Sequence, residues 1–364
     1  MGSSPYIFHR LALLPFRGAE KGPWDTELAS GLASQGEAAF IEFLVSQGLA
    51  PLWHGLISAD HGPFSAAGAA VLRAEAIRAA QIYLLQKKAL AELTGILDNQ
   101  GLDHLVFKGA HLRELLYPEP QVRTACDIDL LVNGDDRNAV IRALLNAGYH
   151  LEVSPVSISH EATLLRDQVG IDIHWDILRP GRTRQPMTGD LIAARQRAGD
   201  HWGPCPEHSM FLMLVHPVIT KYATSPQSTL NRLVDILRFM DKGRINWDGV
   251  LDCLARSGLK TAAWVMVEWL AMLAEVRPPE HFVRAITPGP LRRRYLGHWV
   301  AANYSTRLLR HHTLIRAGFT LPLHDTPGDA WRATAALYRE RRLARERLEA
   351  LRWANPQTRP GDGR

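Results

Sequence analysis

The sequence predicts an α+β protein, in which a short mixed sheet with flanking helices lies between helical N- and C-terminal regions. Three observations predict this class. Apolar residues recur at helical spacing over most of the chain before residue 100 and after residue 180. Between these limits, short aliphatic and β-branched runs alternate with turn residues. The chain has 364 residues and is 46% hydrophobic, which is enough to build a sizeable core.

The N-terminal region, over 1–100, is expected to start irregularly and then become helical. Prolines and glycines recur through residues 1–24, which indicates an irregular lead-in. From Asp25 the apolar spacing is helical up to a stop at Gly48. One long helix is predicted over 66–99, because apolar residues recur at helical spacing and Gly101 follows as a stop signal.

An α/β core is expected over 101–180. Its strands are predicted at 105–107, 126–132 and 149–153, followed by a hairpin of 160–167 and 171–177 around Val169-Gly170. Helices are predicted over 110–117 and 137–147, between the first three strands.

A helical domain over 181–354 and a polar tail over 355–364 complete the chain. Helices are predicted near 189–198, 208–223, 228–241, 247–257, 261–274, 292–317 and 328–353. From Pro288 onward the chain has fifteen arginines, no lysine and six acidic residues, a net charge of +9 within a total of +5. Such a region can contact a polyanionic partner, or it can be an ordinary solvated helix face.

Composition excludes several classes of protein. The three cysteines, Cys126, Cys205 and Cys253, are far apart and lack metal-ligand spacing, so we expect free thiols in a reducing cytoplasm. No run of 18 uncharged apolar residues occurs, and no cleavage site follows the short apolar patch at the start, so neither a membrane anchor nor a signal peptide is expected. Nucleotide-binding glycine motifs, the GxSxG elbow and HExxH are also absent.

Acidic residues alternate with apolar ones in two of the predicted strands. Asp127 and Asp129 project to the same side of the first, about 7 Å apart along the backbone. Two such carboxylates repel each other unless a cation lies between them, and Mg²⁺ bound to substrate phosphates is suited to that place. In the strand over 171–177, Asp172, His174 and Asp176 share a face, and either aspartate can supply a third carboxylate.

The ordered motifs resemble those of a bacterial family of uncharacterised nucleotidyltransferases within the DNA polymerase β-like superfamily. They are Phe107-Lys108-Gly109, Tyr117-Pro118, Arg123, the Asp127–Val132 run and Asp172-Ile173-His174-Trp175. The resemblance implies a minimal nucleotidyltransferase core. It also implies Mg²⁺-dependent transfer of a nucleoside monophosphate from an NTP such as ATP to a hydroxyl-bearing acceptor, with release of pyrophosphate.

By this resemblance, Asp127, Asp129 and Asp172 form a catalytic and metal-binding triad. Asp127 and Asp129 would hold the nucleotide-bound Mg²⁺ and a second Mg²⁺, while Asp172 would complete the second site and help to deprotonate the acceptor hydroxyl. Lys108 and Gly109 occupy the place where the superfamily usually has Gly-Ser, and would contact phosphate.

Further residues have open roles. Arg123 would clamp phosphate, orient Asp127 or form a structural ion pair. His174 would order a metal-bound carboxylate, touch the acceptor or serve the scaffold. In the helical domain, the set His216, Lys221, Arg232 and Asp235 resembles another pattern of the family. Arg232 and Asp235 can pair at i, i+3 as scaffold, or Lys221 and Arg232 can line the cleft and meet a triphosphate.

Two other functions fit the same sequence. The site can transfer another phosphate-linked group, such as a sugar from a nucleotide sugar. Alternatively, the protein can be a catalytically silent binder whose arginine-rich helices recruit an anionic or peptide partner. As acceptor we expect a small molecule or a peptide or protein rather than nucleic acid, and no membrane partner.

Overall fold

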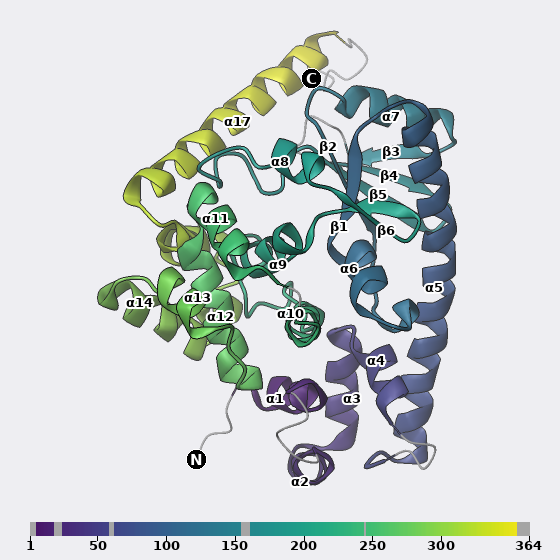
Figure 1. Ribbon diagram of the computed structural model, residues 1–364, viewed down its shortest axis with the longest axis vertical. Coiled ribbons are helices and arrows are strands. Elements are labelled where there is room, and N and C mark those ends of the chain that lie inside the picture. Colours follow the sequence, from purple (N-terminus) through teal and green to yellow (C-terminus); the bar gives the residue numbers. More distant parts are fainter. Residues whose placement is uncertain (1–4, 18–23, 58–61, 154–160, 244, 355–364) are drawn as a thin grey trace, which may run out of the picture.

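The computed structural model describes residues 5–17, 24–57, 62–153, 161–243 and 245–354, with side chains up to residue 343. The predicted tail over 355–364 lies outside the described residues. Figure 1 shows the sheet on one side of the molecule, with the N-terminal helices below it and the C-terminal helices beside it. The long helix α5 (Ala66–Asn99) packs against both the N-terminal helices and the sheet, and so connects them.

A five-stranded sheet has the order β1-β2-β5-β4-β3. Its strands are β1 (His104–Phe107), β2 (Ile128–Val132), β3 (His150–Val153), β4 (Glu161–Arg166) and β5 (Val169–His174). Strands β2 and β5 pair in parallel, and all other neighbours pair antiparallel. The connections contain α6 (Lys108–Leu116), η3 (Pro120–Val122) and α7 (Arg137–Asn146). The predicted α+β class with a short mixed sheet is confirmed.

The predicted hairpin turn is wrong by two residues. Arg166 and Val169 are register partners, so the turn between β4 and β5 consists of Asp167 and Gln168 rather than Val169-Gly170. Asp167 has a φ of 55°, a left-handed conformation that aspartate tolerates and β-branched valine does not. Val169 is instead buried in the sheet.

The two faces of the sheet are covered by different elements. Leu130 and Ile173 belong to a core that the sheet shares with α5 and α7. Leu131 belongs to a larger core that extends through the N-terminal and C-terminal helices. Because side chains alternate along a strand, Asp129 and Asp172 lie on this second face, as the alternation in the sequence predicts.

The N-terminal region consists of α1 (Ile7–Leu13), η1 (Leu14–Phe16), α2 (Asp25–Gln35), α3 (Glu37–Ser46), α4 (Ala50–Leu56) and α5. The predicted irregular lead-in is therefore wrong over 7–16. Leu11 and Leu13 are buried, and the Tyr6 hydroxyl donates a hydrogen bond of 2.5 Å to the carbonyl oxygen of Val300. Packing against distant C-terminal residues stabilises a segment whose local composition indicates a loop.

The C-terminal region begins with α8 (Thr188–Ala193) and a hairpin of β6 (Gln196–Ala198) and β7 (His201–Gly203), which lies against β1. The helices that follow are α9 (Pro206–Ile219), α10 (Asn231–Asp241), α11 (Trp247–Ser257), α12 (Lys260–Ala274), α13 (Glu280–Ile286), α14 (Pro290–Ala301), α15 (Tyr304–Arg307), α16 (His312–Ile315), η4 (Arg316–Thr320), η5 (Leu321–Leu323) and α17 (Pro327–Ala354).

Three details of this region differ from prediction. Residues 196–198 form a strand rather than the end of a helix, and α13 was not predicted. The single helix expected over 292–317 is interrupted after α14, where Asn303 adopts a φ of 54° that helix geometry does not allow. The division of the chain near residues 100 and 180 stays a prediction.

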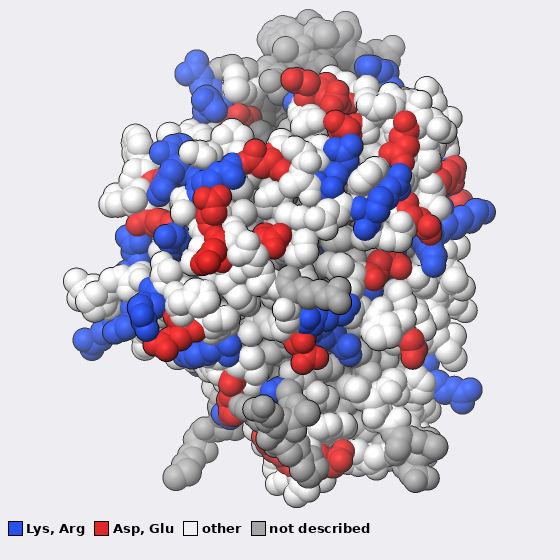
Figure 2. All heavy atoms as spheres, in the orientation of Figure 1, with Lys and Arg blue, Asp and Glu red and all other residues white. Residues whose placement is uncertain are grey.

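Figure 2 shows one face of the molecule, on which basic and acidic side chains are interspersed. Part of the arginine-rich region serves internal contacts: Arg292 donates hydrogen bonds to the carbonyl oxygens of His324 and Asp325, and Arg332 pairs with Asp329 at 2.9 Å. Among the described residues, none of the helices combines the length and the apolar character that crossing a membrane requires.

Candidate active site

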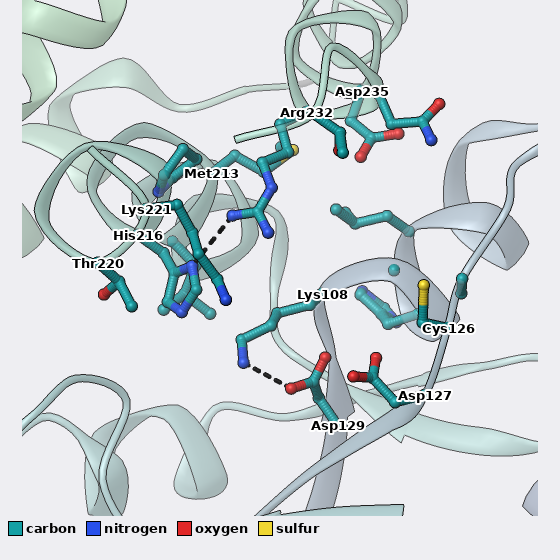
Figure 3. Close-up of a pocket in the computed structure, with 18 of the residues that line it drawn as sticks. Lys108, Cys126, Asp127, Asp129, Met213, His216, Thr220, Lys221, Arg232 and Asp235 are labelled. Carbon is teal, nitrogen blue, oxygen red and sulfur yellow. Dashed lines mark hydrogen bonds and ion pairs between the residues drawn. The ribbon is translucent and has the colours of Figure 1, made fainter. Parts of the chain in front are cut away.

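A cavity of about 620 Å³ lies between the sheet and helices α9 and α10. Its walls come from the start of α6, the strands β2 and β5, and the two helices. Figure 3 shows Asp127 and Asp129 on one side of the cavity and Lys221 and Arg232 on the other. All of the residues proposed from the sequence as catalytic, metal-binding or cofactor-binding line this cavity: Lys108, Gly109, Arg123, Asp127, Asp129, Asp172 and His174. The rival carboxylate Asp176 lines it as well.

The carboxylates are brought together by strand pairing. Asp129 and Asp172 are register partners on the parallel strands β2 and β5, so their side chains leave the same face side by side. One ligand atom from each of Asp129, Asp172 and His174 lies within 4.8 Å of the others. Asp127 precedes β2 by one residue, and Figure 3 shows its carboxylate beside that of Asp129. The tightest cluster thus contains His174 as well as two of the three predicted carboxylates.

Lys108 lies within this acidic cluster. Its Nζ donates a hydrogen bond of 2.5 Å to Asp129 Oδ1 and is 3.3 Å from Nε2 of His174. The same ring nitrogen of His174 is 2.9 Å from Asp129 Oδ1. Asp129 is only 5% exposed, so its charge depends on these partners rather than on water.

Neighbouring Asp127 and Asp129 differ in acidity because their partners differ. Burial, and after it the nearby carboxylates Asp129 and Asp172, raise the pKa of Asp127 to about 7, and Lys108 and Lys221 offset only part of this rise. Burial by itself raises the pKa of Asp129 too, but Lys108 and His174 outweigh that effect and hold it well below its usual range. The positive charge near Asp127 is therefore too small to offset its burial and its acidic neighbours, whereas that near Asp129 is large enough.

Replacing Asp127 by asparagine should stabilise the metal-free protein at pH 8. The pKa of Asp127 rises from 3.8 to about 7 on folding. The stability that this group contributes is therefore fully present below pH 3.8 and is lost as the pH rises through about 7. With allowance for solvent screening, the gain of Asp127→Asn at pH 8 is on the order of 1 kcal/mol. Thermal melts in the presence of a chelator should show it, and the gain should shrink toward pH 5. A melting temperature equal to or below that of the wild type at pH 8 would contradict the assigned environment.

Two residues that support the cluster were not found from the sequence. Thr163 is the register partner of Asp172 on β4, and its Oγ1 donates a hydrogen bond of 2.7 Å to Asp172 Oδ1. Glu161, on the same strand, has Oε2 3.7 Å from Nδ1 of His174. The register of the hairpin places Thr163 beside Asp172. Because the turn was predicted two residues too late, the sequence did not indicate this pair.

Arg123 forms a buried ion pair with Asp235 of α10. Its Nε and Nη2 donate to the two carboxylate oxygens at 3.1 and 2.6 Å, and Tyr117 donates a third hydrogen bond of 2.7 Å. Of the roles left open by the sequence, the ion pair is the one found, and a contact of Arg123 with phosphate stays a prediction. The suggested pairing of Arg232 with Asp235 is not found, and Asp235 is paired with Arg123 instead.

Gly109 is needed for close packing at the start of α6. A Cβ at this position would lie 3.1 Å from Cβ of Ala125 and 3.2 Å from Nη1 of Arg123. A side chain here would require Ala125 or Arg123 to shift by a few tenths of an ångström, so glycine lets the first turn of α6 approach the segment before β2 without that shift.

The wall that faces the carboxylates in Figure 3 is basic and comes from α9, α10 and the segment between them. Arg232 donates through Nη1 toward Nδ1 of His216 at 3.3 Å, and Lys221 lies beside them. Burial lowers the pKa of Lys221, and Arg232 and Lys108 lower it further. Burial together with these cations holds the pKa of His216 well below its usual range, so this imidazole is neutral.

Lys221 and Arg232 are both half-buried, and no carboxylate in the described part of the chain lies within ion-pair distance of either. Lys221 reaches the cavity from an unusual turn, since the next two residues, Tyr222 and Ala223, have φ values of 57° and 47°. Sequence spacing alone does not predict that turn. Two half-buried cations with no carboxylate partner among the described residues give this wall a positive charge that suits an anion.

The acidic wall has the donor set for a divalent cation. Carboxylate oxygens from Asp129 and Asp172 and one imidazole nitrogen already lie within 4.8 Å of one another. Asp127 adds a carboxylate whose raised pKa reflects burial and then the repulsion of its acidic neighbours. A cation bound by oxygen ligands, such as Mg²⁺, fits this set because it would offset that repulsion.

A small mixed sheet that presents register-paired aspartates to a cavity with a basic facing wall fits the nucleotidyltransferase class that the sequence motifs resemble. The family model described as uncharacterised nucleotidyltransferase matches residues 34–274, more than half of the chain. The chain belongs to this family, and the resemblance inferred from its motifs is confirmed. It is thus an enzyme that transfers nucleotidyl groups. No curated protein matches the sequence.

Proposed function

We propose that the protein transfers a nucleoside monophosphate from a Mg²⁺-bound NTP, such as ATP, to a hydroxyl group of a small molecule, peptide or protein, and releases pyrophosphate. One observation carries this proposal. The register-paired aspartates Asp129 and Asp172 face the same cavity as Lys221 and Arg232, two cations with no carboxylate partner among the described residues. Cation-binding and anion-binding walls across one cavity are what a metal-bound polyphosphate requires.

The polyphosphate would lie along the basic wall. Lys221 and Arg232 have lost much of their hydration, as their pKa values, lowered first by burial, indicate. A triphosphate supplies the negative charge that the described residues do not provide there. Arg232 presents a planar guanidinium that can donate two hydrogen bonds to one phosphate, while Lys221 acts as a point charge.

The acidic wall would hold the metal. Asp127 and Asp129 would bind Mg²⁺, with Asp172 completing the set, and the bound ion would neutralise charge on the phosphates. His174 keeps Asp129 in place through the 2.9 Å contact with its Oδ1. Thr163 in turn fixes one oxygen of Asp172. The carboxylates are therefore positioned before substrate binds, which lowers the cost of reorganisation during the reaction.

In the proposed reaction, the acceptor oxygen forms a bond to the α-phosphorus while the bond from that phosphorus to the β-phosphate oxygen breaks. Asp172 accepts the proton of the acceptor hydroxyl, and pyrophosphate leaves with the electron pair of the broken bond. Lys221 and Arg232 stabilise the charge that develops on the leaving pyrophosphate. The products are the nucleotidylated acceptor, pyrophosphate and one proton.

Labelled substrates test the proposal. The protein is incubated with Mg²⁺ and an NTP labelled at the α-phosphate, in parallel with a sugar-labelled nucleotide sugar, against pools of hydroxyl-bearing small molecules, peptides and RNA. We expect the α-phosphate label in an acceptor and an equal amount of pyrophosphate. Label transferred only from the nucleotide sugar, or no binding of the Mg²⁺-bound NTP in calorimetry, would overturn the proposal. We also propose the cytoplasm as its compartment, because Cys126, Cys205 and Cys253 are free thiols.

Replacing Lys221 by methionine should weaken NTP binding without harming the fold. The substitution removes one cation from the basic wall and keeps the length of the side chain, so we expect the dissociation constant for an NTP to rise about tenfold. Stability should stay the same or increase, because the lysine has no ion-pair partner among the described residues. Lys88→Met, on the exposed face of α5, is the matched control and should bind like the wild type. Equal NTP affinity in Lys221→Met would place the polyphosphate elsewhere.

A further inference from the structure

Lys108 is placed differently from the other two cations of the cavity. Its ammonium group is 2.5 Å from Asp129 Oδ1 and 3.3 Å from Nε2 of His174, two members of the cluster with metal-ligand geometry. It also lies 4.7 Å from the centroid of the Phe107 ring. Among the described residues, Lys221 and Arg232 make no hydrogen bond or ion pair with the members of that cluster. Lys108 therefore occupies the acidic side of the cavity rather than the basic one.

The backbone at Lys108 supports a specific role for this placement. Its φ of 55° lies in the left-handed region, which costs a residue with a Cβ about 1 kcal/mol. Such a conformation persists where the surroundings impose it, and it often marks a functional position. Here it is the junction where β1 ends and α6 begins, and from this junction the side chain crosses to β2.

A divalent cation on Asp129 would compete directly with this ammonium. Two cations cannot share one carboxylate oxygen at 2.5 Å without strong mutual repulsion in a buried site. The flexible lysine side chain can leave only if another anion accepts it. Within this cavity, the phosphates of a bound nucleotide are the anion that the proposed function supplies.

We propose that Lys108 is the resident counter-ion of the acidic cluster and makes the site selective for the metal–nucleotide complex over the free divalent cation. The inference rests on the proposed function for the identity of the nucleotide. The metal alone binds weakly because it must displace Lys108 with no new partner for the ammonium. Metal and nucleotide together bind tightly because the phosphates take over that ammonium. The two ligands are thereby coupled, each raising the affinity of the other by the same factor.

The test uses Mn²⁺ as the probe, since it prefers the same oxygen ligands and its free form is visible by electron paramagnetic resonance. Binding is measured with and without a non-hydrolysable α,β-methylene analogue of ATP. The proteins are the wild type, Lys108→Met and the surface control Lys88→Met. Lys108→Gly is a second variant, because glycine adopts a φ of 55° without strain and also removes the ammonium.

In the wild type and in Lys88→Met, the analogue should tighten Mn²⁺ binding about tenfold or more. In Lys108→Met and Lys108→Gly, Mn²⁺ alone should bind about tenfold or more tightly than it does to the wild type, because no ammonium has to be displaced. The effect of the analogue on Mn²⁺ affinity should be smaller in both variants than in the wild type, because only the direct contact of its phosphates with the ion remains to couple the two ligands.

If Mn²⁺ binds the wild type and both Lys108 variants with the same affinity, or binds none of them detectably, the inference is overturned. Lys108 is then a fixed structural ion pair. Lower Mn²⁺ affinity in the variants overturns the inference as well. Failure of the analogue to bind any of the proteins would instead refute the proposed function. The comparison with Mn²⁺ alone decides the role of Lys108 in either case.

Discussion

Asp129→Asn should abolish nucleotidyl transfer, with a loss of kcat/KM of about 10³-fold or more. Asp129 is the centre of the acidic wall: it is the register partner of Asp172 and accepts hydrogen bonds from Lys108 and His174. The amide keeps the shape of the side chain but removes the charge that a metal requires. The variant is assayed with α-labelled NTP and whichever acceptor the wild type labels.

A loss of activity is informative only if the fold survives. Asp129→Asn also leaves Lys108 without its ion pair, so circular dichroism and a melting curve accompany the assay. Asp252→Asn, at an exposed position of α11, is the matched control and should retain full activity. Asp172→Asn should be nearly as inactive as Asp129→Asn, and the double variant little worse, because the two carboxylates act as a unit. Undiminished transfer by Asp129→Asn would remove this cluster from the mechanism.

Arg123→Met should destabilise the protein by about 3–5 kcal/mol, the largest loss of stability expected at the site. Its guanidinium holds both oxygens of Asp235, which is 0% exposed. Without Arg123, that carboxylate is left buried, and the Tyr117 hydroxyl is the one hydrogen-bond donor that remains to it among the described residues. Urea denaturation followed by circular dichroism measures the change in the free energy of unfolding.

A double variant separates the unpaired charge from the lost packing. Arg123→Met with Asp235→Leu should recover a large part of the stability, since no buried charge remains, although Tyr117 then lacks its acceptor. Arg284→Met, which removes an ion pair with Glu280 whose partners are 75% and 86% exposed, is the control and should cost no more than about 0.5 kcal/mol. If Arg123→Met loses as little as this control, the buried pair does not hold α10 against the core.

Much of the fold follows from signals within single segments. The long helix α5 has the predicted bounds, because Ser65 caps its start and Gly101, with a φ of 64°, ends it. The α1 segment and the break at Asn303 were not predicted, since tertiary contacts override local composition in both places. The hairpin turn was misplaced because a two-residue turn at Asp167 and Gln168 leaves a weaker signal than Gly170 does.

The site divides in the same way. The sequence by itself determined which residues share a face within each predicted strand, because the two-residue period of a strand decides where each side chain points. That Asp129 and Asp172 meet was expected from the family resemblance, and the parallel pairing of β2 and β5 brings them side by side. Only the tertiary structure decided which groups face them. Thr163 reaches Asp172 through strand register, and Lys221, in the turn after α9, and Arg232, on α10, reach the cavity because these two helices pack against α6. Periodicity describes one element at a time, whereas a cavity is made by elements whose contacts span many tens of residues, and no local pattern records those contacts.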